Sequence, residues 1–197
     1  MLGSVTFNNF TQPDADLGII DTERLMKILS VLNGTCSMTY QNVEERVIAI
    51  TLKDTNAEVK FNLGDLSIFG EESKLKNEPE YGLTLKMSKD SAKAFVNGCN
   101  AISESNHFTV VGSGSDCELI INYDKEKNLD MIRVPVEIVN GGDIENVSFA
   151  SHHLRSVISA NSEADAISLQ VSDAGLLKCV FSNSEYSAEY FLVAMDR

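Results

Sequence analysis

The sequence predicts an α+β protein in which one unit, a helix followed by about three antiparallel strands, is repeated along the chain. Three stretches carry the apolar spacing of a helix and begin near Thr22, Lys89 and Ser151. Each is followed by short runs rich in β-branched and aromatic residues, with turn-forming residues between them. The helix starts lie roughly 60 to 67 residues apart, and a period of this size is typical of duplicated architectures.

The first predicted helix covers residues 22–33. Its apolar side chains recur on one face at Leu25, Ile28, Leu29 and Leu32. Asp21 stands where an N-cap accepts backbone N–H groups, and Asn33-Gly34 supplies the turn that ends the helix. The strand-like runs that follow are residues 36–40, 46–54, 57–63 and 66–70.

The second and third helices are predicted at residues 89–103 and 150–161, with Ser88 as the N-cap of the second. Their apolar faces contain Ala92, Phe95, Val96 and Cys99 in the second, and Leu154, Val157, Ile158 and Asn161 in the third. The strand-like runs after them are 107–114, 117–126 and 131–140, then 166–173, 176–183 and 188–195. Alternation in "ISLQV" and "LKCVF" indicates strands with one buried and one solvated face.

These elements predict two domains joined by a linker. Residues 1–70 form the first domain and contain one copy of the repeat, and residues 83–197 form the second and contain two copies. The linker is residues 71–82, where "EESKLKNEPEY" is charged and contains a proline. The alternative interpretation is an unrelated α+β protein in which helices and hairpins happen to alternate.

The composition excludes several classes of protein. With 43% hydrophobic residues in 197, the chain can bury a sizeable core. No apolar run is long enough to span a membrane, and the N-terminal "MLGSVTFNNF" lacks the pattern of a signal peptide. The four cysteines form no CxxC pair, and we interpret them as free, mostly buried thiols of a reducing cytoplasm.

Charge is distributed unevenly between the helices and the rest of the chain. The chain has 16 basic and 29 acidic residues, a net charge of −13. The three predicted helices hold five bases and two acids, a net charge of +3, which leaves −16 for the remainder. The five bases are Arg24, Lys27, Lys89, Lys93 and Arg155. Basic helix faces suit duplex DNA bound through its phosphates, although a lysine on a solvated face needs no partner.

The residues argue against an enzyme and against a metal site. His152 and His153 are adjacent, so on a helix they point about 100° apart and cannot act as an i, i+4 metal pair, and His107 is isolated. "VGSGSDC" lacks the lysine of a phosphate-binding loop and predicts a hairpin turn. "GSGSD" is not a nucleophile elbow, and "DKEKNLD" does not have the spacing of a calcium loop.

Three segments of this sequence resemble DNA polymerase sliding clamps. They are "DLGIIDTERLMKILSVLN", "LKMSKDSAKAFVNGCNAIS" and the ending "GLLKCVFSNSEYSAEYFLVAM". The resemblance covers most of residues 17–197, and it is closer to the clamps of large tailed bacteriophages than to the cellular proliferating cell nuclear antigen. It rests on the order of elements and on similarity within these three segments, because no motif here is as specific as a zinc or phosphate signature.

The resemblance implies a DNA clamp fold with helices on one face of the sheets, and three subunits closing a ring around duplex DNA. It implies no cofactor, and it places DNA polymerase and a clamp loader at an apolar pocket beside the interdomain linker. Phage clamps of this type also support late transcription, which implies the cytoplasm of an infected bacterial host. The implied DNA-facing residues are Arg24, Lys27, Lys86, Lys89, Lys93, His152 and Arg155. For the partner pocket, Ile68, Phe69 and Phe191 are apolar candidates, with ordinary core residues as the alternative.

The sequence departs from the clamp pattern in its first domain. Only "MLGSVTFNNFTQPDA" precedes "DLGIID", which is enough for one strand, so one of four expected helices is missing. The chain is then either a truncated or alternatively started clamp or a reduced relative. A second hypothesis is therefore a clamp-fold interaction module that binds a polymerase or transcription factor without encircling DNA. A third, an acidic DNA mimic, predicts acids on the helices, and the +3 of the helices counts against it.

Overall fold

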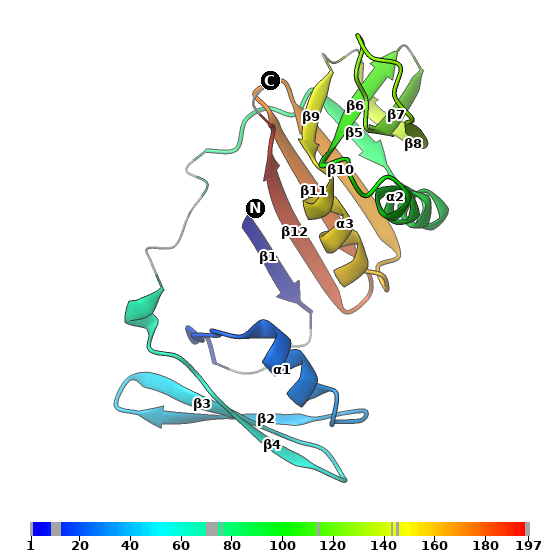
Figure 1. The fold of residues 1–197 in the computed structure, drawn as a ribbon. Coiled ribbons are helices and arrows are strands. Elements are labelled where there is room, and N and C mark those ends of the chain that lie inside the picture. The colour runs from blue at the N-terminus through cyan, green and yellow to red at the C-terminus, as the bar shows by residue number, and fades with distance from the viewer. Residues whose placement is uncertain are drawn as a thin grey trace. The chain divides into compact units, whose positions relative to one another are not determined.

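The structure is a computed structural model that describes residues 2–8, 13–69, 75, 77–113, 115–142, 144 and 146–195. The chain divides into two compact units, each treated by itself below. The first, here called the double unit, consists of Met1–Asn9 and Leu75–Arg197. The second, here called the single unit, consists of Phe10–Lys74. Figure 1 shows the ribbon of both units.

The double unit is a nine-stranded antiparallel sheet with two helices, α2 (Lys89–Ala101) and α3 (Ser151–Ala160). The sheet order is β1-β12-β11-β10-β5-β8-β7-β6-β9. The strands are β1 (Leu2–Phe7), β5 (Leu83–Lys86), β6 (His107–Ser113), β7 (Asp116–Ile121), β8 (Ile132–Gly141), β9 (Val147–Ala150), β10 (Ala166–Ser172), β11 (Leu176–Ser182) and β12 (Tyr186–Val193). The double unit is thus an α+β architecture, as the sequence predicts.

An internal repeat organises the double unit. The order strand, helix, three strands occurs twice, as β5-α2-β6-β7-β8 and as β9-α3-β10-β11-β12. The first strand of each copy pairs with a strand of the other copy: β5 pairs with β10, and β9 pairs with β6. β5 also pairs with the last strand of its own copy, β8, and β9 meets β12 through a bridge between Phe149 and Ala194. The two copies predicted within residues 83–197 are confirmed, and each also has a short leading strand that we did not predict.

Both helices of the double unit pack into one hydrophobic core. The side chain of Ser88 caps α2 by accepting the backbone N–H of Ser91 at 3.0 Å, as predicted. The buried helix residues are Ala92, Phe95, Gly98 and Cys99 in α2, and Ser151, Leu154, Val157 and Ile158 in α3. At the centre of the core, the Phe108 ring lies 5.1 Å from that of Phe95 and 5.7 Å from that of Phe149, between ring centroids. This core fixes the positions of both helices and their exposed charges.

The single unit contains one helix and a three-stranded antiparallel sheet of order β2-β3-β4. Its elements are α1 (Thr22–Leu29), β2 (Ser37–Val43), β3 (Arg46–Lys53), β4 (Glu58–Asn62) and the 3-10 turn η1 (Leu66–Ile68). Asp21 caps α1 by accepting the N–H of Arg24 at 2.8 Å, as predicted. α1 ends at Leu29, earlier than predicted, and the structure buries none of its residues.

The structure differs from the sequence interpretation at two further places. β1 pairs with β12, with Leu2 opposite Phe191 and Phe7 opposite Tyr186, so the N-terminal strand lies in the double unit instead of with the rest of residues 1–70. The run 66–70, predicted as a strand, begins with the η1 turn, because the Asp65 side chain accepts the N–H of Ser67 and favours a turn. In the predicted linker 71–82, residues 71–74 and 76 lie outside the described residues, and residues 77–82 belong to the double unit.

Three predictions of composition and chemistry were checked against the described residues. All four cysteines are free, and Cys99, Cys117 and Cys179 are buried, as interpreted from the sequence. In the described part of the chain, no helix combines the length and apolar character that crossing a bilayer requires. Within the same residues, no three side chains of the His, Cys, Asp and Glu types are grouped so that they could hold a metal ion.

Candidate nucleic-acid interface

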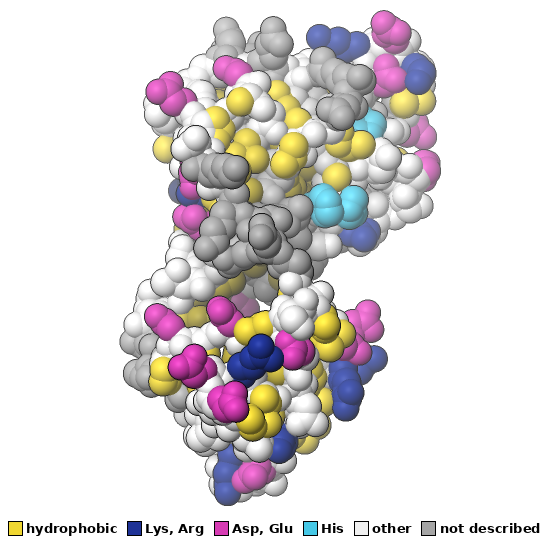
Figure 2. Space-filling view, turned by 90° about the vertical axis from the view of Figure 1, so that its left-hand side faces the viewer, with side chains coloured by type: hydrophobic (Ala, Val, Ile, Leu, Met, Phe, Trp, Pro, Cys, Tyr) yellow, Lys and Arg dark blue, Asp and Glu magenta, His cyan; other side chains and the backbone are white. Residues whose placement is uncertain are grey.

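The basic side chains predicted to face DNA lie on or beside the three helices. With the helix bounds of the structure, α1, α2 and α3 together still hold five bases and two acids, a net charge of +3. Lys86 ends β5, just before α2 begins, and is exposed. On the face of the molecule seen in Figure 2, acidic, basic and hydrophobic side chains are mixed, and no broad field of one sign covers that face. The three helices thus carry a net positive charge, whereas the rest of the chain is net acidic.

α2 and α3 run antiparallel and lie side by side. The first half of α2 and the last turn of α3 border a groove of about 460 Å³, with Lys89 and Lys93 on one side and Ile158 and Ser159 on the other. Arg155, in the middle of α3, donates from Nη1 to the Oδ1 of Asn100 near the end of α2, at 3.1 Å. The structure therefore brings three of the predicted DNA-facing bases onto adjacent helices.

The three bases differ in their exposure and in the polar contacts that their side chains already make. Nζ of Lys89 lies 3.1 Å from Oδ1 of Asp165, and both side chains are more than half exposed, so this ion pair is weak and open to exchange. Lys93 is exposed. Arg155 is half-buried and its hydrogen bond to Asn100 holds one N–H, which leaves four of its five N–H donors for other partners. Among these three bases, Lys89 is the one with an ion pair in the described residues, and the role of all three toward DNA stays a prediction.

His152 lies in the first turn of α3 beside His153. The centroids of the two imidazole rings are 4.0 Å apart, and the ring planes are tilted by 48° to each other. His152 is exposed, whereas His153 is half-buried, and burial followed by the neighbouring His152 lowers the pKa of His153. Because His153 loses its proton more readily than a free histidine, it contributes little positive charge at neutral pH. The role of His152 toward DNA stays a prediction.

Arg24 and Lys27 lie on α1 in the single unit. Both are exposed, and Nζ of Lys27 is 4.0 Å from the Glu23 carboxylate, with both side chains more than four-fifths exposed. An i, i+4 pair this exposed contributes about 0.3 to 0.5 kcal/mol and leaves the lysine available. The structure thus places both bases on a solvated helix surface, and their role toward DNA stays a prediction.

The apolar residues predicted to form a partner pocket lie in different surroundings. Ile68 and Phe69 are exposed, by 62% and 40%, at the end of η1 in the single unit. Phe191 is buried on β12 in the double unit, where it faces the ammonium of Lys178. Because Phe191 is covered within its own unit, it is not a free apolar contact, and a pocket formed by all three residues stays a prediction.

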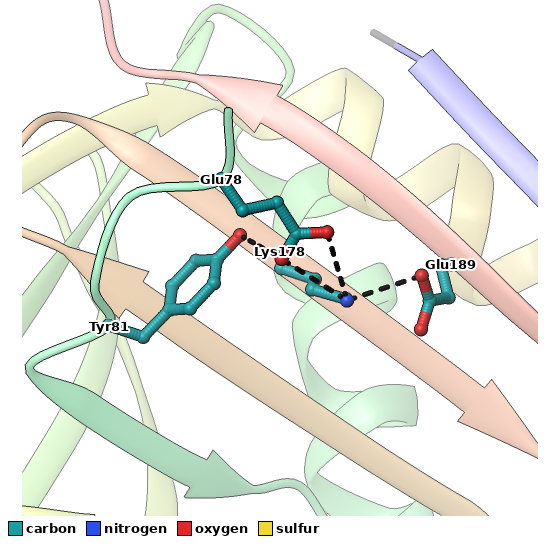
Figure 3. A network of polar contacts seen from close by, with 4 residues as sticks. All are labelled: Glu78, Tyr81, Lys178 and Glu189. Carbon is teal, nitrogen blue, oxygen red and sulfur yellow. Dashed lines mark hydrogen bonds and ion pairs between the residues drawn. The ribbon is translucent and has the colours of Figure 1, made fainter. Parts of the chain in front are cut away.

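A polar network that we did not predict surrounds Lys178 (Figure 3). Nζ of Lys178 lies 3.4 Å from both carboxylate oxygens of Glu78 and 3.2 Å from Oε2 of Glu189. The hydroxyl of Tyr81 donates to Oε2 of Glu78 at 3.3 Å. Burial, and then the Glu78 carboxylate, raise the pKa of Tyr81 to about 12. The sequence signal for this network is a lysine inside the apolar run "LLKCVF". That signal could not identify Glu78 as the partner, because Glu78 lies 100 residues from Lys178 in the sequence.

The fold of this chain, in which a helix and antiparallel strands are repeated with exchange of the leading strand, is similar to that of solved proliferating cell nuclear antigens. The structure of this antigen from Entamoeba histolytica superposes with a TM-score of 0.68 at 19% identity, over 90% of this chain and 71% of that chain. A structure of the A. fulgidus antigen with the C-terminal region of FEN-1 bound superposes with a TM-score of 0.69 at 17% identity, over 89% and 70%.

These likenesses show the fold. The sequence matches no protein-family model and no curated protein. The predicted clamp fold is therefore confirmed at the level of a clamp like the proliferating cell nuclear antigen, and the bacteriophage type stays a prediction.

Proposed function

We propose that this protein is a sliding clamp, a non-enzymatic ring that encircles duplex DNA and tethers a replicative DNA polymerase for processive synthesis. The observation that carries the proposal is the clamp fold with basic helices, +3 on three helices in a chain of −13. In the same proposal the clamp is of the tailed-bacteriophage type, supports late transcription and acts in the cytoplasm of an infected bacterial host. A clamp loader places it on DNA.

The physical basis of the proposal is electrostatic and sequence-independent. In a homotrimeric ring, helices on one face of the sheets would line the hole and bring Lys93 and Arg155 near phosphates. Contacts of this kind hold duplex DNA of any sequence, and their strength falls steeply as salt rises. Because a closed ring is retained by topology, weak contacts that slide are sufficient. The acidic remainder of the chain disfavours binding of DNA elsewhere on the surface.

The experiment measures the mass of the full chain in solution and its retention on DNA. We expect a ring of three chains by sedimentation equilibrium, and retention on a linear duplex whose ends are blocked after loading, but not on one with free ends. The triple variant Lys27→Glu, Lys93→Glu, Arg155→Glu should lower retention with unchanged mass and circular dichroism. Lys127→Glu, an exposed lysine paired with Asp124 in a loop, is the matched control. A strict monomer at micromolar concentration would contradict the proposal.

A second candidate is a clamp-fold module that binds a polymerase or transcription factor without encircling DNA. The observation that favours it is α1, whose apolar residues are all at least partly exposed. The partner surface in this case includes Ile68 and Phe69, both exposed. A monomer that binds a polymerase tail peptide, and loses that binding in Ile68→Ser with Phe69→Ser, would favour this candidate over the ring.

A further inference from the structure

The sequence contains three Asn-Gly pairs, and each lies in a different structural setting. Asn33-Gly34 lies between α1 and β2, Asn97-Gly98 lies in the middle of α2, and Asn140-Gly141 ends β8. In such a pair the side-chain amide of the asparagine can react with the backbone nitrogen of the glycine, because glycine has no Cβ to obstruct the approach. In a folded chain the rate of this reaction depends on how firmly the structure holds that nitrogen.

Two of the three pairs are held by regular structure. The N–H of Gly98 belongs to the hydrogen-bond ladder of α2, and a Cβ on this buried residue would lie 2.8 Å from Cδ1 of Ile121. Asn140 and Gly141 are both paired with β5, and a Cβ on Gly141 would meet the backbone of Gly82. At these two sites the asparagine side chain reaches the glycine nitrogen only after the local structure opens, so the reaction there is slow.

The pair Asn33-Gly34 lies outside regular structure, and both residues are exposed. Gly34 has a φ of +79°, and a Cβ on it would meet no atom within 4 Å. Within the described residues, the N–H of Gly34 donates no hydrogen bond. Nδ2 of Asn33 donates to the carbonyl oxygen of Val31 at 3.5 Å, which is long for a hydrogen bond, so the side chain is weakly held. At this pair the glycine nitrogen is therefore open to the asparagine side chain.

The reaction at this pair needs water and no other reactant. The backbone nitrogen of Gly34 attacks Cγ of Asn33, the new N–Cγ bond closes a succinimide ring, and the Cγ–Nδ2 bond breaks. The proton of the Gly34 nitrogen leaves with the amide group as ammonia. Water then adds to one of the ring carbonyls and opens the ring. Attack at Cγ leaves aspartate, whereas attack at the main-chain carbonyl leaves isoaspartate, in which the backbone continues through the side chain.

Asn33 is also the point at which the α1 segment is joined to the β3–β4 hairpin. Its N–H donates to Oδ2 of Asp54 at 2.6 Å, and Oδ1 of the same buried carboxylate accepts the N–H groups of Asn56 and Ala57. Either product of the reaction places a second carboxylate on residue 33, close to the carboxylate of Asp54, and like charges at short range repel. Isoaspartate also lengthens the main chain by a methylene group before Gly34. Both changes weaken the hydrogen bonds that converge on Asp54.

We propose that Asn33-Gly34 is a site of spontaneous deamidation, and that its product loosens α1 from the β3–β4 hairpin as the protein ages. The inference goes beyond the proposed function and does not depend on it, because it concerns the single unit alone. The modified fraction grows with time, because the ammonia that leaves does not restore the amide.

The first experiment locates deamidation in the full chain. The folded chain is incubated in neutral buffer, and peptide mapping by mass spectrometry follows the replacement of NH2 by OH at each asparagine. We expect Asn33 to react at least about tenfold faster than Asn97 and Asn140, because regular structure protects both of them. In urea the three sites should react at similar rates, which would show that the fold selects the site. A rate at Asn33 no higher than at the other two sites of the folded chain would overturn the proposal.

The second experiment measures the structural consequence. Amide hydrogen exchange of Asn56 and Ala57 should be about tenfold faster in the deamidated fraction of aged chain than in fresh chain, because the contacts to Asp54 are weakened. Asn33→Asp, which carries the new carboxylate, should show the same direction of change. Unchanged exchange in the deamidated fraction would overturn the loosening of α1.

Two variants are matched controls for this measurement. Asn33→Gln keeps the backbone N–H that Asp54 accepts, but its side chain has to close a larger ring, so aged Asn33→Gln should exchange like fresh native chain. Asn62→Asp adds a carboxylate at an exposed position of the same unit and should leave the amides of Asn56 and Ala57 unchanged. Faster exchange in aged Asn33→Gln, equal to that of aged native chain, would assign the loosening to another site and overturn the proposal. Neither experiment needs DNA or a ring, so the ring assay and these measurements fail or succeed separately.

Discussion

The two units contain the same motif of a helix followed by three strands, but only the double unit buries its helices. α2 and α3 each bury four residues, and α1 buries none. In the double unit the two copies exchange leading strands and pack their helices together, whereas the single unit has one helix over three strands. The difference teaches that this motif completes its core by pairing with a second copy, as repeat units generally do.

In the single unit, hydrogen bonds to one carboxylate join the helix segment to the sheet, whereas in the double unit the helices are held by apolar packing. Asp54 follows β3, and its carboxylate accepts the N–H groups of Asn33 at 2.6 Å, Asn56 at 2.7 Å and Ala57 at 2.6 Å. It thereby joins the end of the α1 segment to the β3–β4 hairpin. The hydrogen bond from Asn33, followed by those from Ala57 and Asn56, lowers the pKa of Asp54 below its ordinary value.

The largest expected effect contrasts the two cores. Phe108→Ala removes the central ring of three fully buried phenylalanines and should lower the free energy of unfolding of the double unit by about 3 to 5 kcal/mol. Phe61→Ala, at a buried site of the smaller sheet, should cost less and affect only the single unit. Urea unfolding, monitored in each unit by hydrogen exchange, measures the loss of unfolding free energy in both variants. Equal losses of unfolding free energy in the two variants would contradict the difference between the two cores.

A smaller effect is expected at Gly98, in the middle of α2. Alanine favours a helix over glycine by about 1 kcal/mol, but a Cβ on residue 98 would lie 2.8 Å from Cδ1 of Ile121 and 3.2 Å from Cγ2 of Ile132. Ile121 is fully buried, so Gly98→Ala should be destabilising by about 1 kcal/mol net. Gly142→Ala meets no atom within 4 Å and is the control. Stabilisation by Gly98→Ala would show a looser helix–sheet contact than the structure has.

The next prediction concerns pH and the single unit. Because the folded pKa of Asp54 is below its unfolded value, its carboxylate stabilises the fold above about pH 4, and this contribution is lost as pH falls through the folded pKa. Asp54→Asn should therefore lower the melting temperature of the single unit at pH 7, and by less at pH 3. Glu45→Gln, an exposed carboxylate on the same unit, serves as the comparison. A difference between Asp54→Asn and the native chain that is the same at both pH values would exclude this role.

The smallest effect is expected on α1. Met26 is 70% exposed, so Met26→Ala should change the free energy of unfolding by no more than about 0.5 kcal/mol. Thermal unfolding of the full chain at several concentrations measures it. A loss above about 2 kcal/mol would instead show that α1 is covered in solution, and its dependence on concentration would tell whether a second copy is the cover.

Local signals in the sequence predicted the parts of the fold that local interactions determine. Asp21 and Ser88 located two helix starts because an N-cap acts within three residues. β5 and β9 were not predicted, because each has four residues and is stabilised by strands from the other copy. The fold class followed from the repeat, which needs only periodicity.

The candidate site was less predictable, since its contacts join distant residues. The net charge of the helices could be read from the sequence. The pairing of Lys89 with Asp165 could not, because 76 residues separate them. Phe191 fits an alternating apolar strand, and nothing near it in sequence predicts that the ammonium of Lys178 lies over its ring.

The pairing of β1 with β12 has a consequence for how the chain is made. β1 is synthesised before β12, and Phe7 lies opposite Tyr186. A ribosome adding about 5 to 20 residues per second needs roughly 10 to 40 s to complete β12 after β1 has been made. Throughout that interval the backbone of β1 has no partner strand from its own chain. A nascent chain of this protein therefore exposes the edge of β1 until β12 is complete, which is when chaperones and neighbouring nascent chains compete for it.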